Sequence, residues 1–122
     1  MLYLKAVRDE IPTILMNAGV TAVVVQVSER DFARALVHKL DEEIAEYFES
    51  YDIYELADIV EVLEALHSYG VLSSKQLVKL LHQVYELARL DGSDLGNLAT
   101  IRRDKAALRG KFEKRYILVA AD

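Results

Sequence analysis

The chain has 122 residues, of which 52% are hydrophobic and 29% charged, a balance typical of a globular protein and not of a disordered one. This length predicts a single domain over residues 1–122 with one core. No apolar run approaches the roughly 18–20 residues that span a bilayer, the first residues lack the apolar stretch of a signal peptide, and the absence of cysteine excludes disulfides and thiolate metal sites. We therefore expect a cytoplasmic protein without a membrane partner, and the net charge of −5 argues against a nucleic-acid partner.

The first part of the chain predicts two strands around a short helix. Residues 2–7 (LYLKAV) and 21–27 (TAVVVQV) are rich in β-branched and aromatic residues, as strands are. The segment RDEIPTILMNAG lies between them and predicts a short helix, because Pro12 stands early in it and Gly19 follows its end.

Two longer helices are expected next. Ser28 is in the position of an N-cap for a helix that runs to about Ser50. Asp52 caps a second predicted helix, which continues to Tyr69 and stops at Gly70. Since the link between the two is short, we expect them to form an antiparallel hairpin.

The remainder predicts two more helices and a final strand. SSKQLVKLLHQVYELARL has one apolar stripe and ends near Gly92, DGSDLGN is a loop, and a last helix spans roughly Asn97 to Leu108. The strand-like KRYILVA and the strand 2–7 cannot satisfy their backbones alone, so we expect them to pair, with 21–27 available as a third strand. The predicted fold class is mainly α: an antiparallel helical bundle with a small β-sheet formed by the N- and C-terminal strands.

Residues 41–66 combine a high density of acid with an apolar background. The segment contains ten carboxylates and no Lys or Arg, whereas seven basic residues cluster in 102–115. At about 100° per residue, Glu43 falls about 60° from Leu40, inside the apolar arc of the first long helix, and Glu46 falls just off the edge of that arc. Glu42 and Glu49, on the same helix, point to the opposite side.

The second long helix repeats this arrangement. Glu55 falls about 40° from Ile59, inside the apolar arc, and Asp58 lies on the arc's edge. Glu61 and Glu64 are expected to point away. In an antiparallel pair with facing arcs, the acidic edges of the two helices lie on the same side, and both acid pairs are within about 11 Å of the turn along the helix axes. Four carboxylates are therefore predicted to converge: Glu43, Glu46, Glu55 and Asp58.

Convergent half-buried carboxylates without bases are unfavourable, since like charges and desolvation both disfavour the ionised forms. A hard divalent cation resolves the conflict, and an all-oxygen donor set suits Mg²⁺ or Mn²⁺ better than Zn²⁺. Two alternatives remain open on the residues alone. Glu55 could act only as the partner of the Asp52 cap, and Glu46, like Glu42, could be an ordinary helix-surface acid.

At these positions the sequence resembles a known family. EEIAE (42–46) followed by ELAD (55–58) resembles the EExxE…ExxD signature of the MazG-like all-α nucleoside triphosphate pyrophosphohydrolases, which include phosphoribosyl-ATP pyrophosphohydrolase. KAVRDEIP (5–12) is similar to the KLVRDKIP opening of a small branch of that superfamily, and residues 102–118 are similar to its KKKAEERGGFEKxIFL ending. Glu10 and Lys111 depart from the pattern, which has Lys and Gly there, and the third-helix region is longer than the branch leads us to expect.

The resemblance implies a MazG-like fold with Mg²⁺ on Glu43, Glu46, Glu55 and Asp58, which form the metal-binding and catalytic set. It implies that water attacks a nucleoside triphosphate between the α- and β-phosphates, releasing a nucleoside monophosphate and pyrophosphate, in housecleaning of non-standard nucleotides. The alternatives are a phosphoribosyl-ATP pyrophosphohydrolase and a non-catalytic helical module that binds a nucleotide or a partner protein.

The matching motifs also supply cations for the polyphosphate, and for each of them a solvated surface charge is the alternative. The candidates are Lys5, Arg8, Lys105, Arg109 and Lys114. Pairing of the terminal strands would bring Lys5 and Arg8 close to Lys114 and Arg115, a repulsive group unless an anion lies among them.

The second long helix is apolar around much of its circumference, which suggests more burial than one small bundle supplies. We therefore expect a homodimer or homotetramer with the site near the subunit interface.

Overall fold

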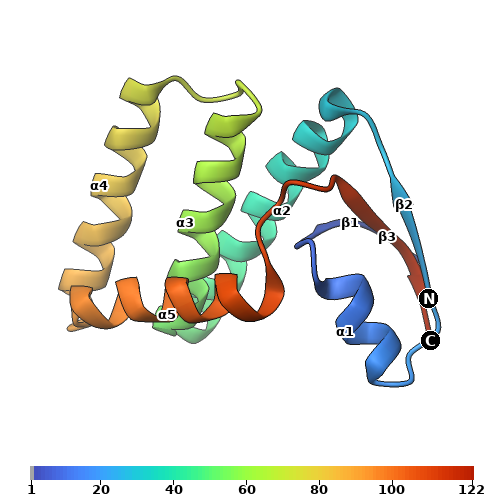
Figure 1. Cartoon of the computed structure of the whole chain (residues 1–122). Helices are drawn as coiled ribbons and strands as arrows, with labels where there is room; N and C mark the ends of the chain where they lie inside the picture. Colours follow the sequence, from blue (N-terminus) through green and yellow to red (C-terminus); the bar gives the residue numbers. More distant parts are fainter. Residues whose placement is uncertain (1) are drawn as a thin grey trace.

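The computed structural model describes residues 2–122, with side chains described from Leu4 onward, and this part of the chain contains five helices and three strands (Figure 1). In chain order the elements are β1 (Leu2–Val7), α1 (Ile11–Asn17), β2 (Ala22–Gln26), α2 (Glu29–Ser50), α3 (Ile53–Ser68), α4 (Ser74–Leu90), α5 (Leu95–Arg109) and β3 (Tyr116–Ala121). The predicted class, mainly helical with a small sheet, is confirmed. None of the helices described is long and apolar enough to cross a membrane.

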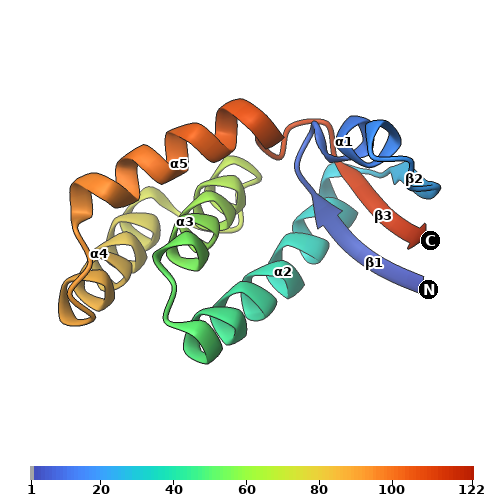
Figure 2. The ribbon, with the colours of Figure 1, turned by 90° about the horizontal axis from the view of Figure 1, so that it is seen from below.

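The sheet joins the two ends of the chain, as the sequence predicted. Its order is β1-β3-β2, with β3 antiparallel to both neighbours, so the last strand lies between the first two. Ala6 is opposite Ile117, and Val24 is opposite Leu118. The sheet and α1 form one end of the molecule, and the helices α3, α4 and α5 form the other (Figures 1 and 2).

Each helix of the α2–α3 hairpin begins with a residue whose side chain caps it. The Ser28 side chain accepts a hydrogen bond from the backbone N–H of Asp31 at 3.2 Å, and Asp52 Oδ1 accepts one from the N–H of Tyr54 at 2.9 Å. Between the helices, Tyr51 adopts a left-handed conformation with φ of 53°. This tight turn returns α3 along α2 (Figure 2), so the predicted antiparallel hairpin is confirmed.

The central helix α3 contributes to two clusters of buried side chains. Leu56, Ile59 and Leu63 pack with residues of α2, α4 and α5, while Val62 and Leu66 pack with residues of α2 and the sheet. The apolar circumference of α3 is therefore covered within one chain. The reason that the sequence offered for an oligomer does not hold, because α4 and α5 provide the burial that a partner was expected to supply.

The last helix begins earlier than predicted, at Leu95 and not at Asn97, because Asp94 caps it by accepting a hydrogen bond from the N–H of Gly96 at 2.8 Å. After α5, Gly110 has φ of 78°, and a Cβ there would lie 3.1 Å from Cβ of Asp9. The close approach lets residues 110–114 run beside the end of β1.

Residues 110–114 are fixed by hydrogen bonds to Asp9, which follows β1, and to Tyr69, which follows α3. Asp9 Oδ1 accepts the N–H groups of Glu113 and Lys114 at 2.9 and 2.8 Å. The hydroxyl of Tyr69 donates to the carbonyl of Phe112 at 2.6 Å. These bonds hold the Phe112 ring in the core, where it forms one wall of the cavity described next.

Candidate metal centre

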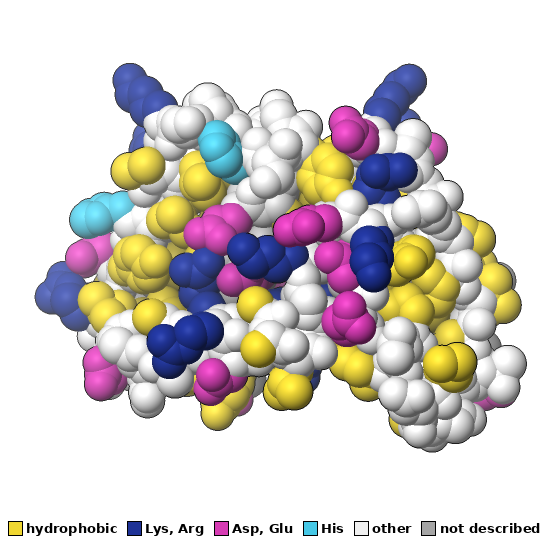
Figure 3. Space-filling model, in the orientation of Figure 1, with side chains coloured by type: hydrophobic (Ala, Val, Ile, Leu, Met, Phe, Trp, Pro, Cys, Tyr) yellow, Lys and Arg dark blue, Asp and Glu magenta, His cyan; other side chains and the backbone are white. Residues whose placement is uncertain are grey.

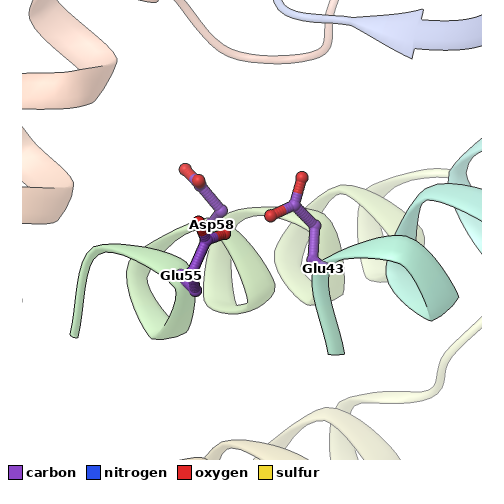
Figure 4. A group of neighbouring side chains, drawn as sticks. All are labelled: Glu43, Glu55 and Asp58. Carbon is purple, nitrogen blue, oxygen red and sulfur yellow. The ribbon is translucent and has the colours of Figure 1, made fainter. Parts of the chain in front are cut away.

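Three carboxylates from the α2–α3 hairpin lie together. Glu43 on α2 faces Glu55 and Asp58 on α3, and one carboxylate oxygen of each lies within 4.8 Å of the others (Figure 4). The spacing of three residues between Glu55 and Asp58 puts both on the same side of α3, about 4.5 Å apart along its axis. Helical periodicity predicted that four acids converge; three of them do, and the fourth, Glu46, is not in this group.

Two oxygens of this cluster have no hydrogen-bond partner although they are buried. They are Oε2 of Glu43 and Oε2 of Glu55, and only 8% of the Glu43 surface is exposed. A buried carboxylate oxygen without a donor is costly, and proteins rarely leave one in that state. A hard cation bound by oxygen ligands would satisfy both oxygens, so the residues present fit a divalent metal such as Mg²⁺.

The electrostatics of the cluster point the same way. Burial raises the pKa of Glu43 from 4.5 to about 8, and the negative charges of Asp58 and Glu46 add to the increase while Lys39 opposes it. Burial also raises the pKa of Glu55, the nearby Glu46 adds to the increase, and the proximity of Glu43 works against it. The cluster therefore retains a proton near neutral pH, the response of a site that lacks positive charge at its centre.

Cations surround the cluster at its edges. Arg8 Nη2 and Lys105 Nζ each bind Asp58, at 2.9 and 3.0 Å, and Lys39 Nζ lies 3.9 Å from Glu43. A cavity of about 130 Å³ opens among these groups, with Arg109 on its wall. Because Arg8, Lys39 and Arg109 line this cavity together with Glu43 and Asp58, it is suited to a metal together with an anion.

The geometry bears on two alternative roles, that of Glu55 as a cap partner and that of Glu46 as a surface acid. The Asp52 N–H donates to Ser50 Oγ at 3.1 Å, so it is not bonded to the Glu55 side chain, which lies in the cluster instead. Glu46 is exposed on the flank of α2 that carries Glu43. It is not one of the three acids that converge, but its charge raises the pKa of both Glu43 and Glu55. Glu42 forms an ion pair with Lys5 at 3.0 Å, away from the cluster.

The structure divides the five cations proposed from the sequence. Arg8 and Lys105 bind Asp58, and Arg109 lines the cavity. Lys5 and Lys114 are not among the described residues that line it. Of the four cations expected to group at the paired strands, Arg8 directs its guanidinium to Asp58, and Arg115 Nε donates to the carbonyl of Val27.

Sequence reasoning missed Lys39, which lines the cavity from α2. Its signal was present, because Lys39 and Glu43 are four residues apart on one helix and such residues face the same side. Lys39 lies just before the acidic segment 41–66, so the composition of that segment does not include it.

The expectation that Glu61 points away from the core is wrong. Only 6% of its surface is exposed, because α5 crosses this side of α3 and Arg102 binds both Glu61 at 3.1 Å and Glu64 at 2.8 Å. Figure 3 shows acidic and basic side chains alternating on the face over α3 and α5. A cavity of about 280 Å³ adjoins these acids, with Lys111 and Phe112 on its far wall. The angular positions of residues around α3 alone could not reveal the contact of Arg102 with Glu61, since it depends on where α5 packs.

Comparison of the chain with protein-family models, curated proteins and solved structures found no match.

Proposed function

We propose that this chain is a Mg²⁺-dependent nucleoside triphosphate pyrophosphohydrolase of the MazG-like type, which cleaves between the α- and β-phosphates. The observation that carries the proposal is the pair of buried, unpartnered carboxylate oxygens on Glu43 and Glu55, beside Asp58 and next to a cavity lined by cations. The order of these acids along the chain matches the signature that the sequence resembles.

Glu43, Glu55 and Asp58 would hold the metal, and Glu46, which acts on Glu55, is the fourth ligand that the resemblance implies. When bound, Mg²⁺, or Mn²⁺ in its place, supplies charge neutralisation for the phosphates and lowers the pKa of a bound water. Arg8, whose surface is 5% exposed, holds Asp58 in position. Arg109 and Lys39 lie on the cavity wall, where they can contact phosphate oxygens.

In the proposed reaction, a water oxygen bonds to the α-phosphorus while the bond from that phosphorus to the α–β bridging oxygen breaks. The products are a nucleoside monophosphate and pyrophosphate. The proton that the water loses must go to a base, and Glu46 is suited to take it, because it is exposed at the edge of the cluster and next to Glu55.

A substrate panel tests the proposal. Canonical and non-standard (d)NTPs and phosphoribosyl-ATP are incubated with the protein and Mg²⁺, and release of pyrophosphate is measured against release of orthophosphate. We expect pyrophosphate with at least one nucleoside triphosphate, dependent on metal. Turnover of phosphoribosyl-ATP alone would assign the alternative reaction, and no release from any compound would contradict the enzymatic proposal.

The rival from another class is a non-catalytic helical module that binds a nucleotide or a partner protein. Such a module has no need of Glu43 in an apolar arc, where burial makes its charge costly. Metal and nucleotide binding without turnover across the panel would favour this rival.

The prediction of a homodimer or homotetramer now depends on a different surface. The described side chains of Val37, Ile44, Phe48 and Tyr51 leave apolar surface exposed along α2, and a groove of about 190 Å³ runs between α2, α3 and α4. Burying this face is the physical reason for an oligomer. Light scattering at micromolar concentration checks it, and a monomer would count against it.

A further inference from the structure

Asp58 differs from the other two acids of the cluster in having both oxygens occupied. Oδ1 accepts from Arg8 Nη2 at 2.9 Å, and Oδ2 accepts from Lys105 Nζ at 3.0 Å. A metal shared by the three acids takes an oxygen from each of them. A divalent ion and a cation side chain on the same carboxylate repel each other, so the affinity for the metal rises when one of the two cations leaves Asp58.

Arg8 is held too firmly to be the one that leaves. Its side chain is 6% exposed, its Nη1 lies 3.4 Å from the carbonyl of Gly110, and its guanidinium stacks 5.7 Å from the centroid of the Phe112 ring. Moving it would break all three contacts and leave a buried charge unpaired.

Lys105 also makes three contacts and its side chain is 13% exposed, but it differs from Arg8 in its geometry. It projects from α5, and besides Asp58 its ammonium contacts only the carbonyl of Tyr54 at 3.1 Å and the face of the Tyr54 ring, among the contacts recorded for the described residues. A compact ammonium on a flexible four-carbon stem can rotate without disturbing the backbone. Arg109 lies one helical turn further on, on the same side of α5, and lines the cavity. Lys105 does not itself line the cavity, but an anion bound there by Arg109 would lie about one helical turn from it along α5.

We infer that Lys105 is an exchangeable counter-ion: it neutralises Asp58 while no metal is bound, and it transfers to a phosphate of the substrate when a metal takes its place. The inference rests on the proposed function, since it needs a metal and a polyphosphate at this site. It assigns Arg8 and Lys105 different tasks. Arg8 stays on Asp58 throughout, and Lys105 couples arrival of the metal to arrival of the anion.

The first test measures Mn²⁺ binding without nucleotide, from the loss of the free Mn²⁺ signal in electron paramagnetic resonance. Lys105→Gln removes the competing cation and is expected to bind Mn²⁺ on the order of tenfold more tightly than the wild type. The matched control is Arg103→Gln, which removes the same charge from an exposed position of α5 and should leave the affinity unchanged. Lys105→Met, which keeps the stem of the side chain, should behave as Lys105→Gln does.

The second test measures binding of inorganic tripolyphosphate, a probe without a base, at saturating Mn²⁺. Lys105→Gln should now bind on the order of tenfold more weakly than the wild type, because the phosphate has lost its cation. Tighter binding of Mn²⁺ together with weaker binding of tripolyphosphate in the same variant is the result that the exchange of Lys105 predicts. Weaker or unchanged Mn²⁺ binding by both Lys105 variants would overturn the inference and make Lys105 a fixed support for Asp58.

Failure of the proposed function has a different outcome. If the wild type binds no Mn²⁺, or if Glu43→Gln binds it as well as the wild type, the metal centre itself is wrong and the inference falls with it. If the wild type binds Mn²⁺, Glu43→Gln does not, and Lys105→Gln shows no gain, the inference alone is wrong.

Discussion

The helix α3 carries acids on two of its sides, and the two groups have opposite electrostatic situations. On one side Glu61 and Glu64 share Arg102, which binds both. On the other side Glu55 and Asp58 meet Glu43, and two of their buried oxygens have no partner. Burial alone does not separate the groups, because Glu61 is as buried as Glu43.

What separates the two groups is how the positive charge is distributed. Arg102 binds both acids of its group, whereas Arg8 and Lys105 both bind Asp58 and leave two oxygens of the other acids without a partner among the described residues. Burial lowers the pKa of the Arg102 guanidinium, but the charges of Glu64 and Glu61 outweigh this and hold it above its ordinary value. A matched ion group of this kind connects α3 to α5 within the fold. Among the residues that the structure describes, no cation lies at the centre of the cluster around Glu43. Burial there raises the pKa of the Glu43 carboxyl to about 8, so this carboxyl holds a proton instead. A buried acid therefore indicates a ligand only after its partners have been counted.

The largest expected effect is on activity. Glu43→Gln should lower metal-dependent pyrophosphate release by at least about a hundredfold, because it removes a metal ligand. The metal-free protein should be as stable as the wild type or more stable, since a buried like-charge conflict is relieved. Glu49→Gln, an exposed acid on the same helix, is the matched control and should retain activity. An active Glu43→Gln with a dead Glu49→Gln would reverse the assignment of faces on α2.

The second group should give the opposite result. Arg102→Met leaves Glu61 buried without its partner and should lower the free energy of unfolding by about 2–3 kcal/mol, which denaturant titration measures. Activity per folded molecule should change little. Unchanged stability with lost activity would mean that Glu61 and Glu64 belong to the site, and would remove the contrast between the two groups.

The last effect concerns pH and is spread over about three pH units. The folded-state pKa of Glu43 is raised from 4.5 to about 8, so between these values the folded state binds more protons than the unfolded state. The metal-free wild type should therefore lose stability relative to Glu43→Gln as pH rises from about 5 to 8, by at most about 1.4 kcal/mol per pH unit. Urea unfolding at several pH values in chelator checks this. Parallel curves for the two proteins would show that Glu43 is already ionised at low pH.

Much of this arrangement could be predicted from the sequence, because it depends on local rules. Caps at Ser28 and Asp52 define the two helices, a short link makes them antiparallel, and periodicity then brings Glu43 and Asp58 to one flank. The sheet followed from two terminal strands that each need a partner.

The rest depends on packing between distant segments, which periodicity does not describe. Arg102 reaches Glu61 only because α5 crosses α3, and α3 is enclosed by α4 and α5. Arg8 likewise binds Asp58, 50 residues away, once residues 110–114 have fixed Phe112 beside it. In each case the sequence provided the charged residue, and the tertiary fold selected its partner.

Thermal unfolding of the wild type, Glu43→Gln and Glu61→Gln, each with and without Mg²⁺, tests the central claim most directly. A metal that binds only the folded state raises the melting temperature as its concentration increases. We predict that Mg²⁺ raises the melting temperature of the wild type and of Glu61→Gln by similar amounts and leaves that of Glu43→Gln unchanged. An equal rise in Glu43→Gln, or a rise that is lost only in Glu61→Gln, would contradict the assignment of the metal to the cluster of Glu43, Glu55 and Asp58.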